Sequence, residues 1–322
     1  MNLLDGKKIL LVTFQFYNYP NRIKEELNKL GADVTYLNPF ADQSLIKEHH
    51  KRKYIHLDKE FVSSVKKIGK AFDYLFLINL NIFSTETINW LVDYFQNSKK
   101  IVYLWDSLDN SVFDTGCLKL FDRVYSFDPI DCKKNSYIQF LPLFYCDSDK
   151  IKKEYKYDFM FIGVARQDRY DYIKKIKDYA IANNLTYYFK LYFRSPLIYY
   201  YNKIIKGLYK NTKASDFTYT LTSQEQLKQI MSDSRIIVDM EINKQNGLTM
   251  RTIECLGMQR KLITTNKDVV NYDFYNPNNI LCVDRDTVQI KDSFIKKDYS
   301  EINKEIYKKY SLEYWIKVIF NI

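Results

Sequence analysis

The chain has 322 residues, of which 46% are hydrophobic and 27% are charged, and its formal net charge is +10. This length and composition are typical of a globular protein with two domains of ordinary size. The positive charge favours an anionic partner, which is a phosphorylated substrate, an anionic membrane surface or nucleic acid. Because the sequence contains no helix-turn-helix, zinc-finger or RNA-binding signature, we expect no nucleic-acid partner.

The cysteines and the apolar runs favour a cytoplasmic location. The five cysteines are odd in number and never form a C-x-x-C pair, which argues for reduced thiols and against structural zinc. The N-terminal residues MNLLDGKKILLV carry Asp5 and enter a strand directly, so we expect no signal peptide. No apolar run approaches the ~20 residues that cross a bilayer. We expect a protein that is soluble or peripheral on the inner face of the cytoplasmic membrane.

The first half of the chain alternates apolar strands with amphipathic helices, which predicts a parallel α/β sheet. The first loop lacks the G-x-G-x-x-G fingerprint of ordinary dinucleotide-binding proteins. The predicted strands are Lys7 to Phe16, Asp33 to Leu37, Tyr74 to Leu80, Lys100 to Trp105, Val124 to Phe127 and Ile138 to Leu141. The predicted helices are Asn21 to Leu30, one from Ser84 or Thr85 through Phe95, and one that begins at Pro129 with Asp128 as N-cap.

Asp106 follows the predicted strand that ends at Trp105. Parallel sheets display functional side chains at the carboxyl ends of their strands, so Asp106 is the first candidate for a catalytic base or for a ligand of an acceptor hydroxyl. An Asx-turn or a helix cap is an equally open interpretation.

His49, His50, Lys51, Arg52 and Lys53 form a basic cluster. A solvated charged loop is the plain interpretation of such a cluster. The functional alternative takes His49 as a general base or as a contact to an acceptor phosphate, because histidine titrates near neutral pH. No carboxylate or cysteine lies nearby at a ligand spacing, so we expect no metal site here.

Pro142 to Tyr157 breaks the periodicity and is rich in charge, as an interdomain linker is. It contains Asp147-Ser148-Asp149, and Asp284-Arg285-Asp286 follows a later strand. Both resemble the metal-binding D-x-D of GT-A enzymes. We favour turn and cap chemistry for both, because neither precedes a matching nucleotide-binding context.

The strand pattern restarts at Asp158 to Gly163, and Val164 to Asp168 is the loop that follows. The next helix is predicted over Arg169 to Asn183, with Asp168 as its cap. An arginine at a helix start is unfavourable against the helix dipole, so Arg169 favours an anionic partner there.

Tyr187 to Lys213 interleaves aromatic residues with six lysines and arginines. This composition suits an anionic membrane interface, with rings at headgroup depth and ammonium groups on phosphates. The alternative is an ordinary strand followed by a core helix. Ser223 and Gln226 then form a capping box for the next helix.

The segment from Ser234 to Asn266 predicts a strand, a loop with an Asn246-Gly247 turn, a helix and a second strand. The strands are Arg235 to Met240 and Lys261 to Thr264, and the helix is Leu248 to Gly257, closed by Gly257. Leu248, Ile253 and Leu256 are expected to face inward.

The start of that helix is a candidate anion site. It offers free N–H groups from about Leu248 to Arg251 together with a partial positive charge. Arg251 adds a bidentate donor for phosphate, and Glu254, one turn along, can accept from ribose hydroxyls. A nucleoside diphosphate satisfies both groups, whereas an i,i+3 surface pair is the structural alternative.

The string GLTMRTIECLGMQRKLITTN resembles the nucleotide-sugar-binding segment of GT-B-type glycosyltransferases of bacterial polysaccharide, capsule or lipopolysaccharide biosynthesis. The resemblance implies that Arg251 holds the donor diphosphate and Glu254 its ribose, beside the Gly247-Leu248-Thr249 backbone. The common retaining pattern has a second glutamate upstream, where this chain has Asn246 and Gly247, so retention or inversion stays open.

The strand that ends at Gly163 resembles the opening of the GT-B C-terminal domain, which implies that Arg166 or Arg169 reaches the donor phosphates. The implied fold is α/β, with two Rossmann-like domains facing a cleft. Residues 1–145 would bind the acceptor and residues 155–310 the nucleotide sugar, with a terminal helix over 311–322, marked by Trp315, that packs back on the first domain.

We therefore expect a metal-independent glycosyltransferase with a nucleotide-sugar donor and a glycan or lipid-linked acceptor. Three alternatives remain. They are a nucleotide-sugar epimerase of the same architecture, a non-catalytic membrane-associated assembly module that depends on the Tyr187 to Lys213 segment, and a nucleic-acid-binding protein with steeply salt-dependent affinity.

Overall fold

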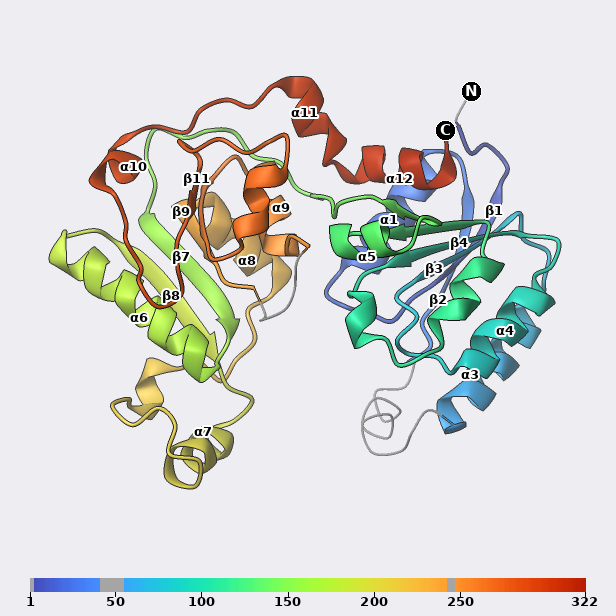
Figure 1. Ribbon diagram of the computed structural model, residues 1–322, viewed down its shortest axis with the longest axis horizontal. Helices are drawn as coiled ribbons and strands as arrows, with labels where there is room; N and C mark the ends of the chain where they lie inside the picture. Colours follow the sequence, from blue (N-terminus) through green and yellow to red (C-terminus); the bar gives the residue numbers. More distant parts are fainter. Residues whose placement is uncertain (1–2, 41–54, 242–246) are drawn as a thin grey trace. The chain divides into compact units, whose positions relative to one another are not determined.

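The computed structural model describes residues 3–40, 55–241 and 247–322, and these form two compact units. Unit 1 comprises the described residues of Met1–Phe144 and Lys309–Ile322, together with Gly247. Unit 2 comprises those of Tyr145–Lys244 and Leu248–Lys308. Each unit is built on its own parallel sheet (Figure 1).

Unit 1 contains a six-stranded sheet in the order β2-β1-β3-β4-β5-β6, and every pair in it is parallel. The central strands are nearly continuous apolar runs such as KILLV and YLFLI, because helices cover both faces. The strands are β1 Lys8–Val12, β2 Asp33–Leu37, β3 Tyr74–Ile78, β4 Lys99–Leu104, β5 Arg123–Ser126 and β6 Ile138–Phe140.

Helices cover both faces of the sheet of unit 1 (Figure 1), and alternate residues of β3 point to opposite faces. Leu75 and Leu77 join the buried cluster that contains residues of α3 and α4. Phe76 faces the other way, and its ring centroid lies 6.0 Å from that of Trp315 on α12. The helices of unit 1 are α1 Tyr19–Lys29, α3 Ile55–Ile68, α4 Thr85–Tyr94, α5 Pro129–Lys134 and α12 Leu312–Phe320, with 3-10 turns at Leu108–Asn110 and Thr115–Leu120.

Two predicted helix starts of unit 1, those of α4 and α5, are confirmed. The Ser84 side chain accepts a hydrogen bond from the Thr87 backbone N–H, and the Asp128 side chain accepts one from Ile130. Pro129 stands at the first helical position, where its missing N–H costs nothing. α1 begins at Tyr19 instead of Asn21, because Pro20 suits a first turn that was predicted as loop.

Unit 2 contains a five-stranded parallel sheet in the order β11-β10-β9-β7-β8. The chain adds β8 on one side of β7 and β9 on the other, so the strand order reverses between β7 and β9. Ligands of open α/β sheets bind outside the carboxyl ends of the strands at such a reversal. The strands are β7 Tyr157–Val164, β8 Tyr187–Tyr192, β9 Ser234–Asp239, β10 Lys261–Thr264 and β11 Ile280–Cys282.

The helices of unit 2 cover the sheet and bury one main apolar cluster, to which α6 contributes Tyr172, Ile173 and Ile176. The predicted capping box of Ser223 and Gln226 is present at the start of α8. The helices are α6 Gln167–Ala182, α7 Pro196–Ile204, α8 Gln224–Ser232, α9 Met250–Gly257, α10 Asp292–Lys296 and α11 Lys304–Lys309, with 3-10 turns at Ala214–Asp216 and Lys267–Asn271.

Gly257 is the last residue of α9, as predicted, but the left-handed conformation that follows the helix does not fall on a glycine. Gln259 adopts the positive φ of 53° instead. A Cβ on Gly257 would lie 2.5 Å from Cγ of Tyr145 and 2.6 Å from the carbonyl oxygen of Asp147. Glycine is needed here for close packing of the linker on α9.

Within the described ranges, no helix is long and apolar enough to span a membrane. Pro142 to Tyr157 contains no helix and no strand until β7 begins. In this part of the chain, Lys228 pairs with Asp147 at 2.7 Å, and Ser232 donates to Asp149 at 2.6 Å. Oδ1 of Asp149 also accepts from the backbone N–H of Lys150 at 2.8 Å, which is local turn chemistry of the predicted kind, so both carboxylates have contacts with α8 in addition to what was predicted.

Candidate functional site

The start of α9 is fastened to the end of β9 by a pair of threonines. The N-cap residue Thr249 accepts a hydrogen bond from the backbone N–H of Thr252 at 3.2 Å, and its hydroxyl donates to Asp239 at 2.6 Å. The hydroxyl of Thr252 also donates to Asp239, at 3.2 Å. Asp239 is only 6% exposed. This buried carboxylate fixes where the helix N–H groups point, and sequence reasoning missed it.

Arg251 crosses from the first turn of α9 to the neighbouring strand β7. Its Nη1 donates to the carbonyl oxygen of Ile162 at 2.6 Å, and its guanidinium lies 5.7 Å from the ring centroid of Phe161. Leu248, Ile253 and Leu256 are buried, as predicted for the inward face of this segment. The predicted helix start at Leu248 was two residues early.

Arg169 reaches the same place from α6. Its Nη1 donates to the carbonyl oxygen of Val164 at 3.0 Å, and Nη2 donates to that of Met240 at 3.3 Å. Its guanidinium lies 5.8 Å from the ring centroid of Phe161, so the same ring contacts two arginines. Such contacts between a cation and a ring face are attractive. The two arginines predicted from separate segments are therefore brought together.

Gly163 makes room for this arrangement. A Cβ at residue 163 would lie 2.8 Å from Cζ of Phe161 and 3.3 Å from Nη1 of Arg169. Residues 161 and 163 point to the same face of β7, so a side chain at 163 would displace the ring and the guanidinium. The contribution of Gly163 to the site is indirect.

The electrostatics of Arg169 reflect a crowded positive site. Burial lowers the pKa of Arg169 below its ordinary value, and the charges of Arg166 and Arg251 act in the same direction. The charge of Asp239 acts to raise this pKa. Nε of Arg169 is buried without a hydrogen-bond partner within the described residues. Clustered like charges with unused donors favour an anion at this edge of the sheet.

Asp168 was predicted as the cap of α6, and this is wrong. The helix begins at Gln167 and Arg166 is its N-cap residue, without a side-chain cap bond, because only two residues separate β7 from the helix. Nε of Arg166 instead donates to Asp168 at 3.1 Å. Burial acts to raise the pKa of Asp168, but this hydrogen bond and the charge of Arg166 outweigh it and hold the pKa below its ordinary value.

A line of alternating charges runs from this pair to the end of β9. Nη1 of Arg285 lies 3.8 Å from Asp168, and Nη2 lies 2.7 Å from Glu241. The backbone N–H of Asp286 donates to Asp284 at 2.9 Å, which is the predicted turn chemistry of the second D-x-D. Sequence reasoning missed Glu241 and Arg285, although a glutamate two residues after a buried strand was a usable signal.

The remaining predicted donor residues occupy the same helix start. Gly247 and Leu248 are buried, so they can meet a ligand only through their backbone groups. Glu254 is half-buried on α9, one turn beyond Arg251. Asn246 and His49 lie outside the described residues.

Asp106 lies in unit 1, just after β4, and is exposed. Nδ2 of Asn79 donates to its carboxylate at 2.6 Å. Asn79 adopts a positive φ of 62° at the end of β3, and its side-chain oxygen accepts from the backbone N–H of Asn81 at 2.9 Å. The Asx-turn is therefore formed by Asn79 and not by Asp106. Asn79 follows β3, and its side chain holds the carboxylate of Asp106, which follows the neighbouring strand β4.

Comparison with solved structures adds the fold family. No protein-family model and no curated protein sequence matches the chain. Anabaena HepE in complex with UDP-glucose superposes with a TM-score of 0.60 at 10% sequence identity, over 98% of this chain and 99% of that one. HepE in complex with UDP gives 0.53 at 9% identity, over 86% and 85%. The chain has the GT-B fold. The predicted α/β class with two Rossmann-like domains is confirmed.

A third similar structure is the UDP-GlcNAc 2-epimerase of Methanocaldococcus jannaschii, with a TM-score of 0.48 at 11% identity over 98% of this chain and 92% of that one. This lower similarity adds nothing to the assignment of the GT-B fold. The roles of the two domains in binding acceptor and donor stay a prediction.

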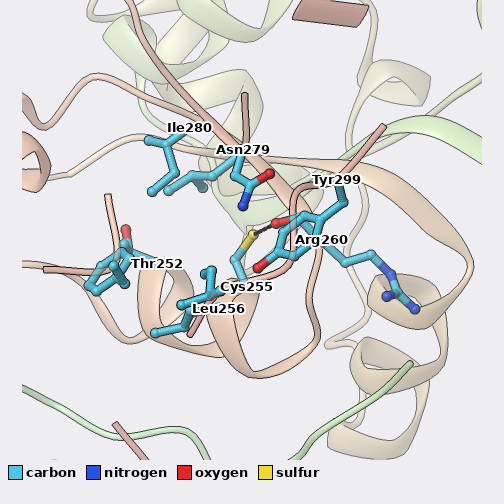
Figure 2. Close-up of a pocket in the computed structure, with 10 residues that line it drawn as sticks. Thr252, Cys255, Leu256, Arg260, Asn279, Ile280 and Tyr299 are labelled. Carbon is cyan, nitrogen blue, oxygen red and sulfur yellow. Dashed lines mark hydrogen bonds between the residues drawn. The ribbon is translucent and has the colours of Figure 1, made fainter. Parts of the chain in front are cut away.

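A small cavity lies beside α9, which contributes Thr252, Cys255 and Leu256 to its lining (Figure 2). Its volume of about 10 Å³ is enough for about one water molecule. Cys255, Arg260 and Tyr299 line it, and the thiol of Cys255 donates to the carbonyl oxygen of Arg260 at 3.1 Å. Burial raises the pKa of this thiol, so it is not a reactive nucleophile. The cavity is a packing feature of the GT-B domain.

Among the residues with a described position, no three histidines, cysteines or carboxylates come together in a group that could hold a metal ion. Positive charge at the carboxyl edge of unit 2 comes from Arg166, Arg169 and Arg251. Electrostatic stabilisation of an anion at this edge is available from side chains and helix N–H groups alone.

Proposed function

We propose that this protein is a glycosyltransferase that moves a sugar from a nucleotide-sugar donor to a glycan or lipid-linked acceptor. The observation that carries the proposal is the meeting of Arg169 and Arg251 on the ring of Phe161, beside the start of α9. This is the carboxyl edge of the sheet where its strand order reverses. The proposed ligand there is the diphosphate of the donor.

Arg251 has donors left for this role. Within the described part of the chain, Nη1 donates to Ile162, whereas Nε and Nη2 make no hydrogen bond. These two groups form an edge suited to bidentate contact with a phosphate. The bond to Ile162 holds the guanidinium in place before the ligand arrives, which reduces the entropy lost on binding.

The same groups would assist the chemical step. When the bond between the sugar and the diphosphate breaks, negative charge grows on the leaving group. Two guanidinium groups and the N–H groups of α9 would stabilise that charge, a role that a metal ion fills in other enzymes. Glu254 is proposed to accept from the ribose hydroxyls. UDP-glucose, the ligand of one HepE structure, belongs to the proposed donor class, and UDP, the ligand of the other, is the diphosphate part of such a donor.

Asp106 is proposed to bind or deprotonate the acceptor hydroxyl. Its exposure leaves it accessible, and the hydrogen bond from Asn79 orients it. A carboxylate in this role needs to lie within hydrogen-bond reach of the hydroxyl. His49 stays the alternative base predicted from the sequence.

The test is titration calorimetry of the full chain with UDP, GDP, dTDP and their sugar conjugates, using wild type, Arg251→Ala and Arg235→Ala. Arg235 is a matched control because it stands at the amino end of β9, at the opposite edge of the same sheet. We expect Arg251→Ala to weaken nucleotide binding about 10- to 100-fold and Arg235→Ala to leave it unchanged. Equal affinities in both variants, or no nucleotide binding by the wild type, would refute the donor site.

The reaction itself is tested by incubating the preferred donor without acceptor. A transferase hydrolyses the donor slowly at most, whereas an epimerase of GT-B architecture converts it to a second nucleotide sugar. Formation of an isomeric nucleotide sugar would replace the proposed transferase with the epimerase.

A further inference from the structure

The apolar side of α7 faces solvent. Leu197, Tyr200, Tyr201 and Ile204 are 80%, 47%, 53% and 73% exposed. Their spacing of i, i+3, i+4 and i+7 places them on a single stripe of the helix. Such a stripe ordinarily faces the core, so α7 is an amphipathic helix turned outward. We call these four residues the α7 stripe.

The opposite side of α7 holds the helix to unit 2. Tyr199 is 1% exposed, and its hydroxyl donates to the carbonyl oxygen of Thr212 at 2.9 Å. Its ring packs against Phe193 and Phe217, with centroids 5.7 and 5.2 Å away. Lys203 donates to Tyr199 at 3.3 Å and so also faces inward. The fold therefore does not depend on the α7 stripe. The alternative of a strand followed by a core helix holds for β8 and for Tyr199, the one buried residue of α7, but not for the stripe.

The surroundings of the stripe are positively charged. Residues 187–213 contain six basic residues and no acidic residue. Arg194, Lys206, Lys210 and Lys213 are exposed, and the ammonium group of Lys206 lies 5.6 Å from the ring centroid of Tyr201. Exposed apolar residues beside basic ones are typical of helices that lie in a membrane interface.

The α7 helix lies at the carboxyl edge of the sheet of unit 2, which is also the edge of the proposed donor site. The helix follows the carboxyl end of β8 and lies beyond the ends of the β7 and β8 arrows (Figure 1). The segment that follows α7 is tied to α6, because the backbone N–H of Tyr209 donates to the side chain of Gln167 at 2.7 Å. It therefore shares the edge of the sheet from which Arg169 and Arg251 extend.

We propose that α7 docks on the surface of a bilayer that contains anionic phospholipid, with the α7 stripe at the depth of the headgroups and the four exposed basic residues on phosphates. A second copy of the chain fits this surface less well, because a two-fold contact through the stripe would bring identical basic residues together. The inference goes beyond the proposed sugar transfer and does not depend on Arg251.

The test is co-sedimentation of the full chain with vesicles of phosphatidylcholine alone and of phosphatidylcholine mixed with phosphatidylglycerol. The stripe variant is Leu197→Glu with Ile204→Glu. The matched control is Ile181→Glu with Val270→Glu, which adds the same charge at two other exposed apolar positions of unit 2. A third variant, Lys206→Gln with Lys210→Gln, removes charge and keeps the stripe. Circular dichroism and thermal melting establish that all variants fold.

We expect wild type and the control variant to sediment with the mixed vesicles, and the stripe variant to lose at least about 10-fold in partition. The lysine variant should bind more weakly to mixed vesicles, and salt should weaken wild-type binding. Equal binding by stripe and control variants would overturn the proposal. So would a wild-type dimer that the stripe variant converts to monomer without any vesicle binding, since a second copy would then cover the stripe.

Discussion

Asn79 donates a hydrogen bond to Asp106 across 2.6 Å from a backbone with a φ of +62°. Asparagine tolerates this left-handed conformation better than most residues, so one residue satisfies both the turn and the contact. We predict that Asn79→Ala lowers the turnover number about 10-fold or more while the donor dissociation constant stays near the wild-type value. Steady-state kinetics and calorimetry measure these two quantities.

Asn79→Gly separates the two functions of Asn79. Glycine accepts the positive φ without strain but cannot hold Asp106. We expect this variant to recover the melting temperature of the wild type but not its turnover number. If Asn79→Gly turns over as fast as wild type, Asn79 has no part in positioning Asp106.

The Thr249 hydroxyl links the start of α9 to Asp239. Thr249→Val keeps the shape of the side chain and removes the oxygen, so it should lower the free energy of unfolding by about 1–2 kcal/mol. It should also weaken nucleotide binding, because the N–H groups of α9 lose their fixed direction. Thr249→Ser keeps the oxygen and should preserve both properties. Urea unfolding and calorimetry measure them, and an undiminished affinity in the valine variant would contradict the role of this link.

Asp131 is 2% exposed, and burial raises its pKa to about 6, with the charges of Asp128 and Asp109 acting in the same direction. Because the folded pKa exceeds the unfolded one, the protonated group stabilises the fold at low pH, and this contribution is lost as pH rises through 6. Asp131→Asn removes the titration and keeps an oxygen for the N–H of Leu108.

We therefore predict that the free energy of unfolding of Asp131→Asn, relative to wild type, increases by about 1 kcal/mol between pH 5 and pH 8. Urea unfolding at both pH values measures the difference. A relative stability of the variant that is independent of pH would show that Asp131 titrates at its ordinary pKa.

Gly257→Ala would place a methyl group 2.6 Å from the carbonyl oxygen of Asp147 and still closer to the ring of Tyr145. Overpacking against backbone should cost about 2 kcal/mol of unfolding free energy, despite the better helix propensity of alanine. Gly116→Ala is the control, because its Cβ would meet the movable Asp114 side chain at 3.2 Å. Urea unfolding of both variants checks the expectation, and equal stabilities would contradict the packing argument.

The proposed transfer should not require a metal ion, because the positive charge at the carboxyl edge of unit 2 is supplied by arginines and helix N–H groups. We expect turnover in the presence of a strong chelator to equal turnover in its absence, and added manganese to have no effect. Activity that disappears with chelator and returns with manganese would contradict the proposed role of Arg169 and Arg251.

The elements that sequence predicts well are those with a clear boundary signal before them. Asp33–Leu37 and Lys261–Thr264 are predicted to the residue, since Gly31 and Gly257 punctuate the chain just before them. The face of α9 that packs inward is also predicted, because its apolar spacing follows the helical period.

The contacts that sequence does not predict join residues far apart in the chain. Asp239 and Thr249 are in contact because the end of β9 lies beside the N-cap of α9. No sequence pattern within either element predicts this contact. The Asp168 cap failed for a local reason, since the helix begins one residue earlier, at Gln167, and Arg166 holds the same carboxylate. A Thr at the N-cap two positions before Arg251 was a visible signal for the helix start.

The position of Trp315 bears on how the protein folds during synthesis. Its indole is 1% exposed and lies within 4.7 Å of the ring centroids of Tyr103 and Phe144 in unit 1. Residue 315 leaves the ribosome after the whole of unit 2, so until then nascent unit 1 lacks the helix that covers Tyr103 and Phe144. Unit 2 is thus free to reach its native state first, although its residues are translated later than most of unit 1.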